Sequence, residues 1–270
     1  MLTLVPTPIG NIADISLRAM DALAQADVLL CEDTRVTKKL LHILQERYSI
    51  ERKEQEFISL HSHNEAAFIE KLSPSFFESN VIYVSDAGMP GISDPGQLLV
   101  QYCQEHNIEY DVLPGANALL TAFVASGFVN TQMLFFGFLP HKGKERAQAL
   151  QGALHNGFTT ILYEAPHRLD KLLKELADEA PERRVFCAKE LSKKYQSYFH
   201  GSATDMSKQI TKDMIKGEWV VVIEAGEARQ STLSEKDVLE LDLPKKSAAK
   251  LISKITGENT KACYQRLLES

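Results

Sequence analysis

Short apolar runs alternate with amphipathic stretches along the first half of the chain. The runs LTLV, VLLC and VIYV consist almost entirely of apolar side chains, which is the pattern of strands buried on both faces. Because helical stretches separate them, they indicate a mostly parallel α/β sheet. The strands that we predict here lie at residues 2–5, 28–31, 57–60, 81–84 and 110–113.

Helices are predicted between these strands from apolar residues at helical spacing and from capping residues. Asp14 is the N-cap candidate of the first helix. Asp94 and Pro95 fit the N-cap and the first position of a helix that reaches about His106. Gly127 ends a helix of small residues. The predicted helices lie at about 14–26, 34–46, from 64 onward, 94–106 and 115–127.

Several strand patterns follow one another in the second half, which predicts a mixed α/β domain. They lie at 133–138, within 159–168, and at 183–191, 195–201 and 218–226, with a basic helix that opens at HKGKER and another helix near 202–214. Polar residues at 128–132 indicate a crossover, and EARQSTLSEKDVLELDL is typical of a polar linker. We predict α/β domains at 1–115 and 116–228, followed by a linker and a small helical appendage over 229–270.

The composition fits a soluble globular protein. The chain has 270 residues, of which 44% are hydrophobic and 24% charged. No apolar run approaches the roughly 20 residues that a membrane helix needs. The start has no basic region typical of a signal peptide. The four cysteines are scattered without a CxxC motif, which favours the reducing cytoplasm over a disulfide framework or a zinc site.

The charge is distributed unevenly. The net charge is −6, but residues 1–140 carry −9 and residues 141–270 carry +3. This asymmetry indicates that a polyanion meets the second half. An ordinary solvated surface is an equally good interpretation of the charge alone.

The most unusual sequences follow directly after predicted strands. They are PTPIGN, EDTR, SDAGMPGISDPG, LPGANA and EAPHR, and in an open α/β sheet such loops bound the ligand crevice. The glycine-rich loop at 85–96 has no Lys or Arg and matches neither phosphate-binding motif, GxxxxGK[ST] or GxGxxG. It therefore favours a ligand with hydroxyl or ammonium groups over a polyanion. Asp86 is the expected ligand contact, Asp94 is a helix cap, and Mg²⁺ on both is an alternative.

These motifs, together with FFGFLP, YEAPHR and KEL, resemble the bacterial 16S ribosomal RNA cytidine 2′-O-methyltransferases of the tetrapyrrole methylase superfamily. The resemblance runs from about Leu2 to Gly226, and the C-terminal segment is similar to a helix-turn-helix-like appendage. It implies two α/β domains of the tetrapyrrole methylase type, with S-adenosylmethionine in the cleft between them. It also implies a cytoplasmic homodimer that methylates a cytidine in the decoding region of 16S rRNA, within the small ribosomal subunit.

The chain departs mildly from the family pattern. Met89 stands where Thr is usual, Ala116-Asn117 where Pro-Ser is usual, and Ser192-Lys193 where Thr-Lys is usual. Without the usual Thr and Ser hydroxyls we expect individual hydrogen bonds to the cofactor to be lost, but not the activity. The cofactor-binding residues that the resemblance implies are Pro8, Ser85, Asp86, Gly88, Met89, Ile92, Asn117, Ala118, Tyr163 and Ala165.

Eight residues are candidates for the chemistry: Glu32, Asp33, Arg35, His61, Asn64, Glu164, His167 and Arg168. Glu164 is the preferred general base, with an orienting role as the alternative. Arg35 and Arg168 suit the phosphates that flank the target nucleotide, or else form salt bridges to Asp33 or Glu164. His167 is a base or a partner of a helix N-terminus. We expect no metal, because the motif His61-Ser62-His63 has no third ligand nearby.

RNA contacts are expected from the basic second half. Lys246, Lys250 and Lys254 recur every four residues and share one helix face, with Ala249, Ile252 and Ile255 on a partly opposed apolar face. A solvated helix face is the alternative. Aromatic residues at 195–199 suit base stacking, but a core or dimer contact explains them equally well. The other expected contacts are Lys142, Lys144, Arg146, Lys189, Lys193 and Lys194.

Three other functions fit parts of the sequence. A porphyrin or corrin methylase would share the cleft, but the basic second half favours RNA. A non-enzymatic ribosome-assembly factor would not need the intact loops around Asp86 and Glu164. A phosphate-binding hydrolase would need a basic residue in the glycine-rich loop.

Overall fold

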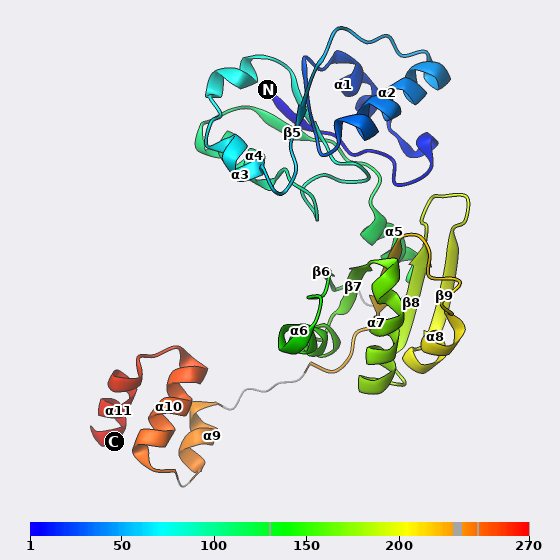
Figure 1. Cartoon of the computed structure of the whole chain (residues 1–270). Coiled ribbons are helices and arrows are strands. Elements are labelled where there is room, and N and C mark those ends of the chain that lie inside the picture. Colours follow the sequence, from blue (N-terminus) through cyan, green and yellow to red (C-terminus); the bar gives the residue numbers. More distant parts are fainter. Residues whose placement is uncertain (130, 229–233, 242, 270) are drawn as a thin grey trace. The chain divides into compact units, whose positions relative to one another are not determined.

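The computed structural model describes residues 1–129, 131–228, 234–241 and 243–269. The chain forms two compact units, Met1–Gly226 and Glu227–Ser270 (Figure 1). Among the described residues, no helix is both long and apolar enough to cross a membrane.

The first half of the larger unit contains a fully parallel sheet, as its apolar runs predicted. The strand order is β3-β2-β4-β1-β5, and every neighbouring pair is parallel. Apolar side chains cover both faces, because the crossover helices lie on either side of the sheet. The strands are β1 (Leu2–Leu4), β2 (Val28–Cys31), β3 (Glu56–Ser59), β4 (Val81–Val84) and β5 (Tyr110–Val112).

Two helices of this half start at different residues from those predicted, whereas α2 begins at Thr34 as expected. Ser16, not Asp14, is the N-cap of α1, because Asp14 ends a preceding 3-10 helix. Asp94 does not cap α4, which begins at Gln97 after an N-cap at Gly96. The N–H of Gly96 instead donates to Oε1 of Glu65, at 2.8 Å. The helices are α1 (Leu17–Gln25), α2 (Thr34–Tyr48), α3 (Glu65–Ile69) and α4 (Gln97–Glu105).

The second half contains a mixed sheet, as its successive strand patterns predicted. The order is β6-β7-β10-β8-β9, in which only β6 and β7 are parallel. Two sheets with a helical C-terminal unit confirm the predicted fold class. The strands are β6 (Met133–Gly137), β7 (Thr159–Glu164), β8 (Arg184–Lys189), β9 (Ser197–Ser202) and β10 (Trp219–Ile223).

Alternation along β10 separates two apolar layers on the second sheet. Val221 and Ile223 pack with α6, α7 and α8, whereas Val220 and Val222 pack with α5. The helix α5 therefore follows the first sheet in sequence but covers a face of the second sheet (Figure 1). The helices are α5 (Ala118–Ser126), α6 (Gly143–Leu154), α7 (Pro166–Glu179) and α8 (Ala203–Gln209).

The two halves of the larger unit touch at a seam between the loop after β1 and the loop after β8. The N–H of Asn11 donates to Oγ of Ser192 at 3.3 Å, and Ser192 Oγ donates to the carboxylate of Asp14. A Cβ at Gly10 would lie 2.5 Å from Cγ of Lys193 and 2.8 Å from the carbonyl carbon of Ser192. The seam therefore requires glycine at position 10.

In the smaller unit, the described residues form three packed helices. One of them, α9, lies within the predicted polar linker. It begins with a capping box formed by Ser234 and Asp237. Linker residues 229–233 and 242 lie outside the described residues. The predicted apolar face is shifted, because Ile255 is exposed while Ala248, Ala249 and Ile252 are buried. The helices are α9 (Glu235–Glu240), α10 (Lys245–Thr256) and α11 (Thr260–Glu269).

Candidate active site

A cavity of about 380 Å³ lies where loops of the two sheets meet. Four of the five unusual loops contribute to it, and only EDTR does not. The loop after β1 is tied to the glycine-rich loop by paired backbone hydrogen bonds between Thr7 and Gly88, both 3.0 Å long. Gly88 adopts a φ of 87°, which favours glycine at this bridge.

Seven of the ten predicted cofactor-binding residues line this cavity. They come from the glycine-rich loop, the start of α5 and the end of β7. The lining also includes apolar residues that sequence reasoning missed, since the second sheet contributes them from positions that look like ordinary core. The predicted residues in the lining are Gly88, Met89, Ile92, Asn117, Ala118, Tyr163 and Ala165, and the missed apolar ones include Ile9, Phe138, Ala188, Leu191 and Val220.

Pro8, Ser85 and Asp86 do not line the cavity. Ser85 is buried at the start of the glycine-rich loop. Asp86 joins two loops: its Oδ1 accepts from the N–H of Asp33 at 3.0 Å, and its own N–H donates to Oε2 of Glu32 at 3.0 Å. Burial and the nearby Glu32 raise the pKa of Asp86. Its carboxylate is thus used in part to hold the loop after β2 against the loop after β4.

Asp94 is the carboxylate that the glycine-rich loop presents to the cavity. Sequence reasoning made it a helix cap, but Gly96 has that position. Burial, followed by the charges of Glu32 and Asp86, raises the pKa of Asp94 to about 6, although a hydrogen bond with the Ser85 hydroxyl lowers it. The sequence contained one signal against the cap assignment of Asp94: Gly96, two residues later, can also occupy an N-cap position.

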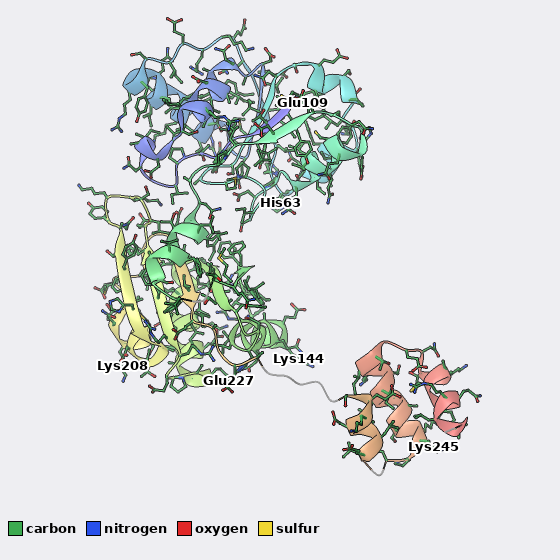
Figure 2. All side chains as sticks on the ribbon, turned by 180° about the vertical axis from the view of Figure 1, so that it is seen from behind. His63, Glu109, Lys144, Lys208, Glu227 and Lys245 are labelled. Atoms are coloured by element: carbon green, nitrogen blue, oxygen red, sulfur yellow. The ribbon has the colours of Figure 1, made fainter. Side chains whose placement is uncertain are left out.

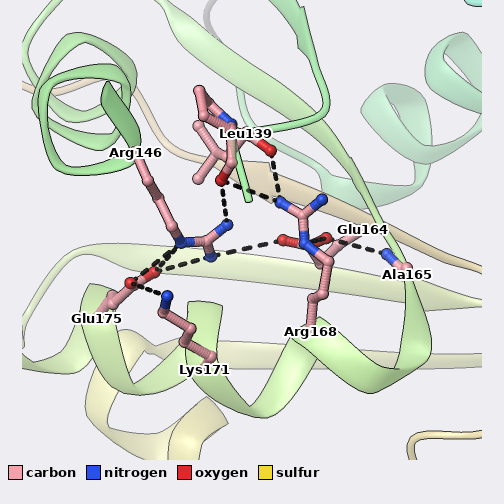
Figure 3. A network of polar contacts seen from close by, with 8 residues as sticks. Leu139, Arg146, Glu164, Ala165, Arg168, Lys171 and Glu175 are labelled. Carbon is pink, nitrogen blue, oxygen red and sulfur yellow. Dashed lines mark hydrogen bonds and ion pairs between the residues drawn. The ribbon is translucent and has the colours of Figure 1, made fainter. Parts of the chain in front are cut away.

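Glu164 belongs to a buried network of charges at the cavity wall (Figure 3). Its Oε1 lies 3.0 Å from Nε of Arg168, and its Oε2 lies 3.6 Å from an Nη of Arg146. Its side chain is fully buried. Burial raises its pKa, and the two guanidinium groups oppose that shift. This pairing favours the orienting role over the predicted role of general base, because both oxygens already face cations.

Arg146 does not have the exposed position that was expected of an RNA contact. Its side chain is only 2% exposed, and it pairs with Glu175 at 2.8 Å as well as with Glu164. It also donates to the carbonyl of Pro140 at 3.1 Å. The prediction was wrong because the run HKGKER places Lys142, Lys144 and Arg146 at the start of one helix, where they look equivalent in the sequence. In the structure the two lysines are exposed, whereas the side chain of Arg146 lies on the buried face of α6.

Arg168 and Arg35 both form the salt bridges that were the alternative to phosphate binding. Arg168 also donates to the carbonyls of Leu139 and Pro140. Arg35 pairs with the N-cap residue Asp33 at 2.6 Å, although its side chain is 88% exposed. His167 is exposed in the first turn of α7, outside the cavity lining.

The remaining basic candidates differ in their surroundings. Lys142 and Lys144 are exposed at the start of α6, as Figure 2 shows for Lys144. Lys193 lies between Glu190 and Glu218, at 3.0 and 2.9 Å. Lys189 donates to the carbonyl of Met214, whereas Lys194 is exposed. Lys246, Lys250 and Lys254 are all exposed on α10 in the smaller unit.

The described part of the chain contains no group of three His, Cys, Asp or Glu residues that could hold a metal ion. The rings of His61 and His63 lie edge to face, 5.9 Å apart.

Comparison with known proteins identifies the class first. The family model for Tetrapyrrole (Corrin/Porphyrin) Methylases matches residues 1–207. Among solved structures, the methyltransferase CobJ superposes with a TM-score of 0.58 at 18% identity, covering 83% of this chain and 94% of that one. A Thermus thermophilus uroporphyrin-III C-methyl transferase complexed with S-adenyl homocysteine superposes with a TM-score of 0.54 at 15% identity, covering 82% and 96%. The fold is thus that of the tetrapyrrole methylases.

Curated relatives identify a particular family within the tetrapyrrole methylases. Ribosomal RNA small subunit methyltransferase I of Campylobacter fetus is 47% identical over 99% of this chain and 100% of its own length. The protein of the same name from Helicobacter pylori strain 26695 is 46% identical over 100% and 99%. The Bacillus subtilis protein is 40% identical over 83% and 75%. The chain belongs to the ribosomal RNA small subunit methyltransferase I family, within the tetrapyrrole methylases.

Proposed function

We propose that this chain transfers a methyl group from S-adenosylmethionine to the 2′-oxygen of a cytidine in the decoding region of 16S ribosomal RNA. The observation that carries the proposal is the full-length similarity to relatives named for small-subunit RNA methylation. That similarity includes the cavity-forming loops and the C-terminal unit. The activity belongs to the bacterial cytoplasm, where ribosomal subunits are assembled.

The cavity suits the methyl donor. Its volume of about 380 Å³ lies within the usual range for small-ligand sites. Apolar side chains such as Ile92, Leu191 and Val220 suit an adenine ring. Gly88 and Ala87 leave room for close backbone approach. The bound sulfonium would supply an already activated methyl group, so positioning of the acceptor provides much of the rate.

Two basic surfaces support RNA as the acceptor. Lys142 and Lys144 follow Phe138, which lines the cavity, by only a few residues. In the other unit, the exposed lysines of α10 provide a second set of phosphate contacts. A porphyrin or corrin substrate would not require either surface.

A homodimer is part of the proposal. Leu120 and Val124 project from α5 with 45% and 78% exposure, so this helix has an apolar face without a described partner in the chain. A second copy of the chain would cover it. Light scattering of wild type and Val124→Glu tests this assignment: we expect a dimer that the charged residue dissociates. Equal masses for the two proteins, or a monomeric wild type, would contradict it.

The catalytic proposal is tested by tritium transfer from labelled S-adenosylmethionine. The acceptors are small subunits lacking methylation, naked 16S RNA and a tetrapyrrole. We expect incorporation into RNA, recovered as 2′-O-methylcytidine after nucleoside digestion and mass spectrometry. Transfer only to the tetrapyrrole, or recovery of a base-methylated nucleoside, would overturn the proposal.

A further inference from the structure

Four titratable side chains line the cavity: Asp94, Glu164, Glu218 and Tyr163. A 2′-hydroxyl must lose a proton as its oxygen accepts a methyl group, so one group near the acceptor has to take that proton. A group already paired with cations is poorly suited to this task, because protonation would break the pair. The pairing of the four groups therefore discriminates between them.

Three of the four are disfavoured by their contacts. Both oxygens of Glu164 face guanidinium groups, at 3.0 and 3.6 Å. Glu218 pairs with Lys193 at 2.9 Å, and its side chain is 76% exposed to solvent. Burial raises the pKa of the Tyr163 phenol to about 12, so it is protonated at neutral pH.

Asp94 differs in every one of these respects. It lies on the loop after β4, and its neighbours are the Ser85 hydroxyl and the carboxylates of Glu32 and Asp86. Tyr163 from the second sheet and Tyr83 from β4 also lie within its electrostatic influence. None of these groups is a cation. It does not cap a helix, since Gly96 occupies that position.

From this geometry we infer that Asp94 is the catalytic base, which accepts the proton of the acceptor hydroxyl during methyl transfer. The inference rests on the proposed function. The hydroxyl oxygen forms its bond to the methyl carbon while the carbon–sulfur bond breaks and leaves its electron pair on sulfur. The proton passes to the carboxylate of Asp94, which gains neutrality as the sulfonium loses its charge, so charge balances. The nearby carboxylates Glu32 and Asp86 favour that protonated product.

The ionisation of Asp94 matches this task. A pKa of about 6 leaves the carboxylate ionised at neutral pH, yet makes it a stronger base than an ordinary aspartate. We expect the logarithm of the transfer rate to rise with pH up to about 6 and then level off.

Asp94→Asn tests the inference in single-turnover transfer to small subunits at saturating cofactor. We expect the rate to fall by about 10²-fold or more, with loss of the acidic inflection, while the Kd for S-adenosylmethionine changes by less than about threefold. Asp21→Asn, an exposed change on α1, is the matched control and should behave as wild type. Asp94→Glu keeps a carboxylate and should retain the inflection at a reduced rate, which provides a test even if Asp94→Asn does not fold.

A second readout needs no activity. In ¹³C NMR of the free protein, we expect one aspartate carboxyl to titrate near pH 6 and to be missing from the Asp94→Asn spectrum. If the wild type transfers the methyl group and Asp94→Asn is equally active, the inference about Asp94 is overturned but the proposed function is not. A full rate at saturation combined with a lost cofactor affinity would also overturn it, since Asp94 would then bind the donor. No transfer by the wild type would overturn the proposed function instead.

Discussion

Arg168 Nε lies 3.0 Å from Oε1 of Glu164, and the Glu164 side chain has no exposure to solvent (Figure 3). Through the same guanidinium, Arg168 donates to the carbonyl of Leu139, which lies two residues after the end of β6. Arg146 holds the carbonyl of Pro140 from the other side. The network therefore ties the segment between β6 and α6 to the start of α7, beside Phe138 in the cavity wall.

The buried network makes Glu164 important for stability. Glu164→Gln keeps the shape of the side chain but removes the buried negative charge that faces two guanidinium groups, so we expect the free energy of unfolding to fall by about 3 kcal/mol. Asp170→Asn is the control, because it breaks the exposed pair with Lys174 on the same helix, whose side chains are 31% and 60% exposed, and it should cost less than about 1 kcal/mol. Urea denaturation measures both, followed by the fluorescence of Trp219, the single tryptophan. Equal losses would contradict a dominant buried pair.

The raised pKa of Asp94 predicts that its ionised carboxylate lowers the stability of the folded protein at neutral pH. A carboxyl whose pKa is higher in the folded state than in the unfolded state opposes folding once the pH passes its unfolded value. The opposition begins above about pH 4 and is complete above the folded value of about 6. Asp94→Asn should therefore raise the free energy of unfolding at pH 8 by about 1 kcal/mol, after allowing for solvent screening, and leave it unchanged at pH 3.5. A constant difference between these pH values would argue against the assignment.

The seam at Gly10 predicts a steric effect on folding and on cofactor binding. A methyl group there would meet the backbone of Ser192 at 2.8 Å, which cannot be relieved by rotating a side chain. We expect Gly10→Ala to cost about 1–3 kcal/mol and to weaken the binding of S-adenosylmethionine in calorimetry. Gly152→Ala, inside α6 and 3.9 Å from Phe136, should instead stabilise the protein by about 0.5–1 kcal/mol. If Gly10→Ala binds S-adenosylmethionine with unaltered affinity, the seam does not influence cofactor binding in the cavity.

The lysines of α10 predict a change in salt dependence. Replacing Lys246, Lys250 and Lys254 by Ala should weaken binding to 16S RNA and reduce the slope of log K against log salt by about 2. The control variant replaces three exposed lysines of the larger unit by Ala: Lys208, Lys212 and Lys216 (Figure 2 labels Lys208). It removes the same total charge as the α10 variant. Filter binding across salt concentrations measures both. The same decrease in both variants would mean that net charge alone matters.

Local pattern was sufficient for most of the fold. The five strands of the first sheet follow from apolar runs, and Gly127 ends α5 in the left-handed conformation, as predicted. Capping was harder, because Asp14 and Asp94 have the right chemistry but a nearby Ser16 or Gly96 competes for the position. Sequence spacing cannot decide between two caps a few residues apart, since tertiary contacts such as that of Glu65 with Gly96 select one.

The sequence by itself determined the alternation of strands and helices, the loops that meet at the cavity, and the family. These depend on periodicity and on short motifs, which are local. Only the tertiary structure decided which charges are paired. Arg146 and Glu164 look like reactive surface groups in the sequence, yet the fold buries them together, while Asp94 faces the cavity without a cation. The reason is physical: the ionisation and reactivity of a side chain depend on burial and on charges distant in sequence, which only the packed chain brings together.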